Sequence, residues 1–252
     1  MGKRMKVLRL LPLTASIAVV ILVAGKSHSS TSMQGTGTIK GHVRLSGKSP
    51  GNTVIRMGVD PMCGSINAGK RVIQEAVLTS ADGGLKNAFV KLQGTFPQTP
   101  VPRQPVILDE RGCVYVPRVI GMRVGQTLQI RNDDPLQHNV HSMSDHNNNI
   151  NVGQATSGIV SELRPKSEEV MLRFGCDIHR WMTAYVGVVS HPYFAVSGEG
   201  GTFEIDNVPA GTQTIQVWHE VYGLLTKTVR VQGGAIANVE FSYTGAEKLP
   251  TK

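Results

Sequence analysis

The feature that most constrains the fold of this chain is a series of short segments in which apolar and polar residues alternate. These segments cover residues 38–45, 88–92, 124–132, 169–176, 201–205, 214–218, 226–231 and 237–243. Residues typical of turns, mainly Gly, Pro, Asn and Asp, stand between them. When apolar and polar residues alternate with a period of two, one face of each strand is apolar and packs against a core. Only residues 69–80 have a weak helical pattern, so we expect an all-β fold built of β-sandwiches.

The N-terminal segment has the pattern of an export signal. Basic residues from Lys3 to Arg9 are followed by an uncharged apolar stretch over 10–25. This stretch is shorter than the ~20 residues that a membrane-spanning helix prefers, which favours a cleaved signal over a retained anchor. Residues 1–30 are therefore predicted to send the chain to the periplasm or another extracytoplasmic compartment, with membrane attachment only if the segment stays uncleaved.

The formal net charge of +8 is concentrated at the N-terminus. Five of the 26 basic residues precede position 27 and no acidic residue does, so the chain without this segment carries a charge near +3. A mildly basic, solvated surface explains such a value without a polyanionic partner. We therefore expect no nucleic-acid partner.

The three cysteines divide by their sequence neighbours. Export to an oxidising compartment favours a disulfide, and an odd number of cysteines leaves one thiol over. Cys176 stands among residue types that bind metals, whereas Cys63 and Cys113 do not. We expect a disulfide between Cys63 and Cys113 and a separate role for Cys176.

The run CDIHRWM at residues 176–182 carries the clearest chemical signal in the chain. It places the thiol of Cys176, the imidazole of His179 and the thioether of Met182 on one short loop. An earlier segment supplies a second imidazole: in an extended strand His138 shares the face of Val140, so it is favoured over its neighbour at position 141. Two imidazoles, a thiolate and a weak axial thioether are the ligands of an electron-transfer copper site.

Three other interpretations of these residues are less favoured. A structural zinc site more often contains paired cysteines, and a buried thiol can have such neighbours without any metal. A copper enzyme would need an open coordination position, or a second metal beside an acid or base. The four candidate ligands here already fill the coordination sphere, so we expect no enzymatic activity.

The ligand motifs resemble those of cupredoxins over about residues 104–191. The resemblance rests on the segment VGQTLQIRN at 124–132, on HNV at 138–140 and on the Cys-x₂-His-x₂-Met loop, whose short spacing is similar to that of amicyanin. The wider chain resembles the plastocyanin-like proteins of methylamine utilisation, through RWMTAY at 180–185 and HPYFAV at 191–196.

This resemblance implies a Greek-key β-sandwich with one type I (blue) copper ion. His138, Cys176 and His179 would be the equatorial ligands and Met182 the axial one. The resemblance also implies that Asn139 joins the two ligand loops by hydrogen bonds. It further implies that His179 lies near the surface, where it would be the electron port.

A second module is indicated on both sides of the copper motif. The segment GTFEIDNVPAG at 201–211 resembles a carboxypeptidase regulatory-like (transthyretin-like) β-sandwich, and residues 37–43 and 87–92 resemble its first strands. Residues 36–95 plus 197–245 would then form this sandwich, with the cupredoxin domain, 96–196, inserted in it. Two sandwiches in simple succession are the alternative.

These features together predict an exported copper protein that carries electrons between redox proteins, such as c-type cytochromes or dehydrogenases. The alternative is an envelope module that binds carbohydrate or protein, in which copper is structural or stored.

Overall fold

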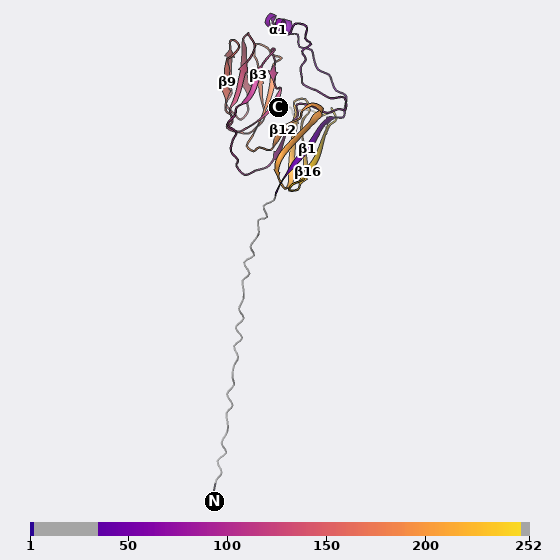
Figure 1. Cartoon of the computed structure of the whole chain (residues 1–252), viewed down its shortest axis with the longest axis vertical. Coiled ribbons are helices and arrows are strands. Elements are labelled where there is room, and N and C mark those ends of the chain that lie inside the picture. The colour runs from indigo at the N-terminus through magenta and orange to yellow at the C-terminus, as the bar shows by residue number, and fades with distance from the viewer. Residues whose placement is uncertain (3–34, 248–252) are drawn as a thin grey trace. The chain divides into compact units, whose positions relative to one another are not determined.

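The computed structural model describes residues 1–2 and 35–247 of the chain (Figure 1). The predicted export segment, 1–30, lies outside the described residues apart from its first two. In the described ranges no helix is long and apolar enough to cross a membrane. These ranges are dominated by strands, which confirms the predicted all-β fold class.

One β-sandwich is formed by strands from both ends of the described chain. Its strands are β1 (Thr36–Leu45), β2 (Phe89–Gln93), β12 (Phe194–Val196), β13 (Thr202–Pro209), β14 (Gly211–His219), β15 (Gly223–Val231) and β16 (Ile236–Tyr243). They make a three-stranded sheet, β13-β1-β16, and a four-stranded sheet, β12-β2-β14-β15. Both sheets bury apolar side chains in one core, including Ile39, Leu92 and Phe241. We call this unit the outer sandwich.

A second sandwich is formed by the strands between β2 and β12. Its strands are β3 (Val106–Glu110), β4 (Tyr115–Val116), β5 (Val119–Arg123), β6 (Leu128–Asn132), β7 (His138–Met143), β8 (Asn151–Gln154), β9 (Val160–Leu163), β10 (Glu169–Gly175) and β11 (Thr183–Val189). The sheets have the orders β5-β11-β10-β7-β8 and β4-β3-β6-β9. Leu128, Ile130 and Phe174 lie in its core. We call this unit the inner sandwich.

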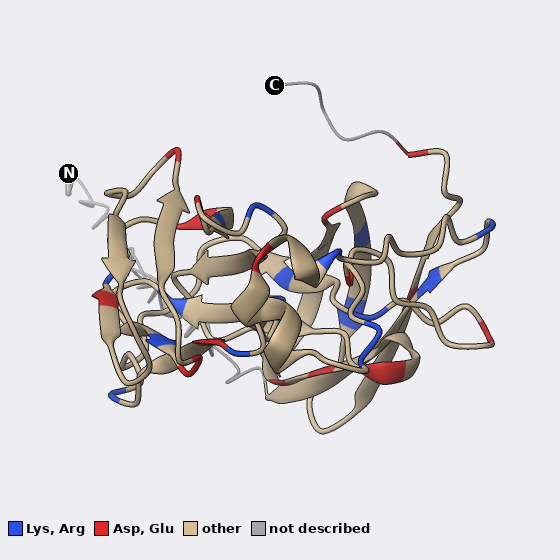
Figure 2. Cartoon of the chain, turned by 90° about the horizontal axis from the view of Figure 1, so that it is seen from above, with Lys and Arg blue, Asp and Glu red and all other residues tan. Residues whose placement is uncertain are grey.

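The chain leaves the outer sandwich after β2 and re-enters it at β12, and these two strands pair with each other in antiparallel fashion. All strands of the inner sandwich therefore come from one continuous stretch of chain. The exact domain boundaries, and the likeness of the outer sandwich to carboxypeptidase regulatory-like domains, stay predictions. Basic and acidic residues are interspersed along the ribbon rather than confined to one region (Figure 2).

A long connection, residues 46–88, runs from β1 to β2 and contains η1 (Met57–Val59) and α1 (Pro61–Ile66). The weak helical pattern expected at 69–80 does not form a helix. Backbone bonds such as Ile55 N to Val72 O hold that part as an extended bridge instead. The helix lies earlier because Asp60 caps it, accepting hydrogen bonds from the backbone N–H groups of Met62 and Cys63.

Candidate metal centre

Strand pairing places the candidate ligands at one end of the five-stranded sheet. His138 is the first residue of β7, and Cys176 follows the last residue of β10. Because β10 lies between β7 and β11, Gly175 pairs with both His141 and Thr183. The loop over 176–182 therefore begins beside β7, the strand that carries His138, and ends at β11 on the other side of β10.

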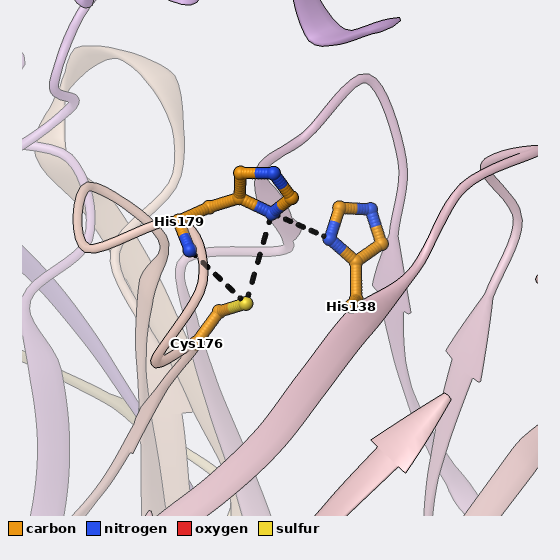
Figure 3. A group of neighbouring side chains, drawn as sticks. All are labelled: His138, Cys176 and His179. Atoms are coloured by element: carbon orange, nitrogen blue, oxygen red, sulfur yellow. Dashed lines mark hydrogen bonds between the residues drawn. The ribbon is translucent and has the colours of Figure 1, made fainter. Parts of the chain in front are cut away.

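His138, Cys176 and His179 each offer a ligand atom, and these atoms all lie within 4.8 Å of one another. The two Nδ1 atoms are 3.0 Å apart, and Cys176 Sγ lies 3.7 Å from His179 Nδ1 (Figure 3). All three residues are buried, with exposed fractions of 0 %, 4 % and 1 %. The structure thus brings together, away from water, one thiol and two imidazoles from distant parts of the sequence.

The thiol of Cys176 is held in its reactive form by its surroundings. Burial raises its pKa, but hydrogen bonds with His138 and His179 and from the backbone N–H groups of His179 and Asn139 outweigh burial and lower the pKa to about 6. The two N–H groups lie 3.4 Å from the sulfur. The thiolate is the form of cysteine that binds metal ions.

Each histidine has a carboxylate partner on its other ring nitrogen. Asp134 lies 2.9 Å from His138 Nε2, and Asp60 lies 3.2 Å from His179 Nε2. A carboxylate that accepts a hydrogen bond from Nε2–H leaves Nδ1 available to a metal and increases the basicity of the imidazole. Burial lowers the pKa of His138, but Asp134 and Cys176 raise it to about 9. The donor set, a thiolate with two oriented imidazoles, fits copper.

Neither carboxylate was among the site residues predicted from the sequence. Asp134 had a recognisable signal, because it precedes His138 by only four positions. It also accepts hydrogen bonds from the backbone N–H groups of Gly112 and Cys113, which fix its position. Asp60 is 119 positions from His179, and no local pattern connects the two.

Asn139 and Met182 are the other residues singled out in the sequence. Asn139 Oδ1 accepts a hydrogen bond of 3.0 Å from the backbone N–H of Asp177, which ties β7 to the loop over 176–182. Met182 is buried in the same core cluster as Cys176, and its backbone N–H donates to His179 O at 2.8 Å. Its role as an axial ligand stays a prediction.

The predicted disulfide between Cys63 and Cys113 is present, with a sulfur–sulfur distance of 2.05 Å. It lies directly against the centre, because Cys63 Sγ is 3.6 Å from His179 Nε2. The expectation that His179 lies near the surface is wrong. The disulfide attaches the 46–88 segment to the inner sandwich, and Asp60 and Cys63 of this segment cover the imidazole.

The inner sandwich also contains a buried carboxyl group close to the candidate ligands. Glu110, at the end of β3, is fully buried, and neither carboxyl oxygen has a hydrogen-bond partner among the described residues. The hydroxyl of Tyr115 is near it but donates to the backbone oxygens of Asn139 and Gly175. Burial raises the pKa of Glu110 to about 7.

Comparison with protein-family models found no match, and comparison with curated proteins found none either. Among solved structures, a purple cupredoxin from Nitrosopumilus maritimus is similar at 22% identity over 33% of this chain and 98% of its own, with a TM-score of 0.29. A Cu(I) mutant of amicyanin is similar at 16% identity over 39% of this chain and 97% of its own (TM-score 0.31).

The copper-containing nitrite reductase of Thermus scotoductus SA-01 is similar at 16% identity over 38% of this chain, with a TM-score of 0.32. The match spans only 24% of the enzyme's length. All three likenesses are partial. The metal assignment below therefore rests on the geometry of the ligand residues themselves.

Proposed function

We propose that this chain binds one copper ion in a type I site and carries electrons between redox proteins outside the cytoplasm. The observation that supports this proposal is the convergence of a buried, low-pKa thiol with two histidine Nδ1 atoms at the end of one sheet. In this proposal His138, Cys176 and His179 would hold the copper ion, and Met182 would add a weaker thioether ligand.

The protein's contribution is to keep these donors in place while the metal changes its charge. Copper would supply a one-electron couple when bound. Three paired strands hold the thiol and both imidazoles, and the two aspartates fix the orientation of both rings. A site that is already formed needs little rearrangement between the two oxidation states, which suits electron transfer.

The partners and the compartment belong to the same proposal. The export pattern of residues 1–30 favours an extracytoplasmic location, and c-type cytochromes or dehydrogenases are the redox proteins expected there. We propose no catalytic role, because the four proposed ligands leave no open coordination position for a substrate.

An absorption spectrum of the copper-loaded, oxidised protein tests the proposal. A short bond between copper and the Cys176 thiolate should give an intense visible band. Cys176→Ser should abolish this band and leave the strand content, measured by circular dichroism, unchanged. His141→Ala is a suitable control, because His141 pairs with Asp177 and does not belong to the ligand group. A colourless wild-type protein that takes up zinc stoichiometrically would exclude the proposed function.

A further inference from the structure

The covering of His179 raises the question of how an electron would reach the metal. The Nε2 edge of the ring lies 3.2 Å from Asp60 and 3.6 Å from the sulfur of Cys63. A redox partner therefore cannot touch this imidazole directly. The electron must pass through a group that contacts the ring and also reaches the surface.

Trp181 is such a group. Its ring lies 5.1 Å from the His179 ring, centroid to centroid, and it is only partly buried. Its orientation is fixed, because the indole N–H donates to Cys113 O at 2.8 Å and the amide of Gln74 donates to Trp181 O at 2.8 Å. Trp181 thus connects the candidate copper ligand to the space on its other side.

That space is a cavity of about 530 Å³, lined by Trp181, β4 and residues of the 46–88 segment. Its volume is within the range of small-molecule sites. Four basic residues line it, against one acidic residue, Glu75. Lys86 and Arg118 have carboxylate partners, whereas Lys70 and Arg71 are exposed and form no ion pair with any described residue.

One residue of the lining has an unpaired polar group. Asn87 also lines the cavity, and its buried side-chain Nδ2 has no hydrogen-bond partner among the described residues. A buried N–H donor without an acceptor is costly for a protein to keep. The two exposed cations at this cavity are complementary to a small anion.

We propose that this cavity binds a small redox-active anion, which exchanges one electron with the copper through Trp181 and His179. The inference rests on the proposed electron-transfer function. When the anion is the donor, it loses one electron and Cu(II) becomes Cu(I), with no bond made or broken and no proton required. The anion binds through Lys70 and Arg71 and lies against the exposed part of Trp181.

Binding is tested first without the metal, with the redox-inert trianion hexacyanocobaltate(III). The chain has two tryptophans, so a Trp218→Phe background leaves Trp181 as the only indole fluorophore. The anion should change the fluorescence of Trp181 in a saturable manner. Lys70→Glu combined with Arg71→Glu should weaken binding by about tenfold or more at low salt. A matched control is Lys166→Glu with Arg230→Glu, two exposed cations outside the cavity, which should alter binding less than about twofold.

Electron exchange is tested next, with the copper-loaded protein. Oxidation of the Cu(I) form by ferricyanide should slow by about tenfold in the Lys70/Arg71 variant, and added salt should reduce the difference. Oxidation by the cation tris(1,10-phenanthroline)cobalt(III) should not slow in that variant. Trp181→Leu should slow the ferricyanide reaction more than Trp181→Phe does, with the same visible band.

The two proposals fail in different ways. A copper-loaded protein with the visible band whose Trp181 fluorescence does not respond to hexacyanocobaltate(III) overturns the anion site and leaves the proposed function standing. Anion binding in a protein that lacks the band overturns the proposed function. A third outcome is that the Lys70/Arg71 variant slows electron exchange with an acidic cytochrome but not with any small anion. In that case the cavity receives a side chain of a protein partner, and the small-anion site is overturned.

Discussion

At the scale of single residues, the two aspartates account for the state of the candidate ligands. An imidazole presents either nitrogen to a metal, and the hydrogen bond on the other nitrogen decides which one. Asp134 is the better placed of the two, since it is buried and held by two backbone N–H groups. Asp60 is more exposed. Its pKa is lowered by the hydrogen bond from the backbone N–H of Cys63 and next by its hydrogen bond with His179.

The role of Asp134 gives a prediction for the metal-free protein. In Asp134→Asn the imidazolium of His138 loses its carboxylate partner, so the pKa of His138 should fall from about 9 toward its ordinary value. Titration of the histidine ring protons by NMR measures this shift directly. Asp133→Asn is the control, because it changes the adjacent carboxylate, which pairs with Arg111. This variant should leave the pKa of His138 unchanged. An unchanged pKa in the Asp134 variant would mean that Cys176 and Glu110 maintain the imidazolium without Asp134.

Glu110 gives a prediction about stability and pH. Its pKa is near 4.5 in the unfolded chain and about 7 in the folded one, because of burial. The folded state therefore binds more protons between these values, so the free energy of unfolding should fall as the pH rises through this window. Glu110→Gln removes the ionisation, so at pH 8 the metal-free variant should be more stable than wild type by up to roughly 3 kcal/mol.

Urea denaturation of metal-free protein at pH 5 and pH 8 measures this effect. Glu162→Gln serves as the matched control, because Glu162 is an exposed residue on β9 that bonds to Gln129. If wild type and Glu110→Gln lose stability equally between the two pH values, Glu110 is not the group responsible.

At the scale of secondary-structure elements, the sequence predicted what is local. The alternation at 169–176 corresponds to β10, and Leu172 and Phe174 are buried as expected from strand parity. The same parity argument selected His138 over His141. The predicted strand at 38–45 likewise falls within β1.

The elements that the sequence did not reveal depend on contacts between distant residues. The short strands β4, β8 and β9 contain too few residues for a clear alternation, and the longer β3, β5 and β11 were not predicted either. The covering of His179 depends on Asp60 and on the disulfide, both of which join positions far apart in the chain. The family resemblance predicted His179 near the surface because the resemblance held no information about the 46–88 segment.

The disulfide gives a prediction at this scale. It joins residues 50 positions apart, and the loop-closure model assigns about 4 kcal/mol to a cross-link of that length. Cys63→Ser with Cys113→Ser should lower the free energy of unfolding by a value of this order. Hydrogen exchange should accelerate first in residues 57–66, because η1 and α1 lose their covalent attachment to the inner sandwich. Slow exchange in the variant would show that hydrogen bonds such as that of Asn67 with Gly112 O hold the segment unaided.

At the scale of the whole molecule, the two sandwiches are joined by more than the chain crossings. Arg118 of the inner sandwich and Glu220 of the outer one form a partly buried ion pair, with an Nη2 to Oε2 distance of 2.8 Å. Phe89 on β2 packs in one cluster with Val119 and Val189 of the inner sandwich. The sheet that carries the candidate ligands therefore lies directly against the outer sandwich.

The Phe89 contact depends on two glycines that pair across neighbouring strands, Gly121 on β5 and Gly187 on β11. A Cβ on Gly187 would come within 2.3 Å of the Phe89 ring, and one on Gly121 within 2.5 Å of the Phe194 ring. Such distances require the backbone or the rings to move. The two glycines thus leave a flat place on the inner sheet, which the aromatic rings of the outer sandwich occupy.

This close approach gives a prediction for the assembly of the two sandwiches. Gly187→Ala should lower the free energy of unfolding by about 1–3 kcal/mol, as overpacking of a well-filled core does. Gly153→Ala on β8 is the control, because its Cβ would meet only the Gln137 side chain at 3.6 Å. Combining Gly187→Ala with Phe89→Leu should recover part of the loss, since the smaller side chain makes room for the methyl group. Urea denaturation of wild type, Gly187→Ala, Phe89→Leu and the double variant gives the coupling energy of the pair. If the losses of unfolding free energy of the two single variants simply add in the double variant, Gly187 does not make room for the Phe89 ring.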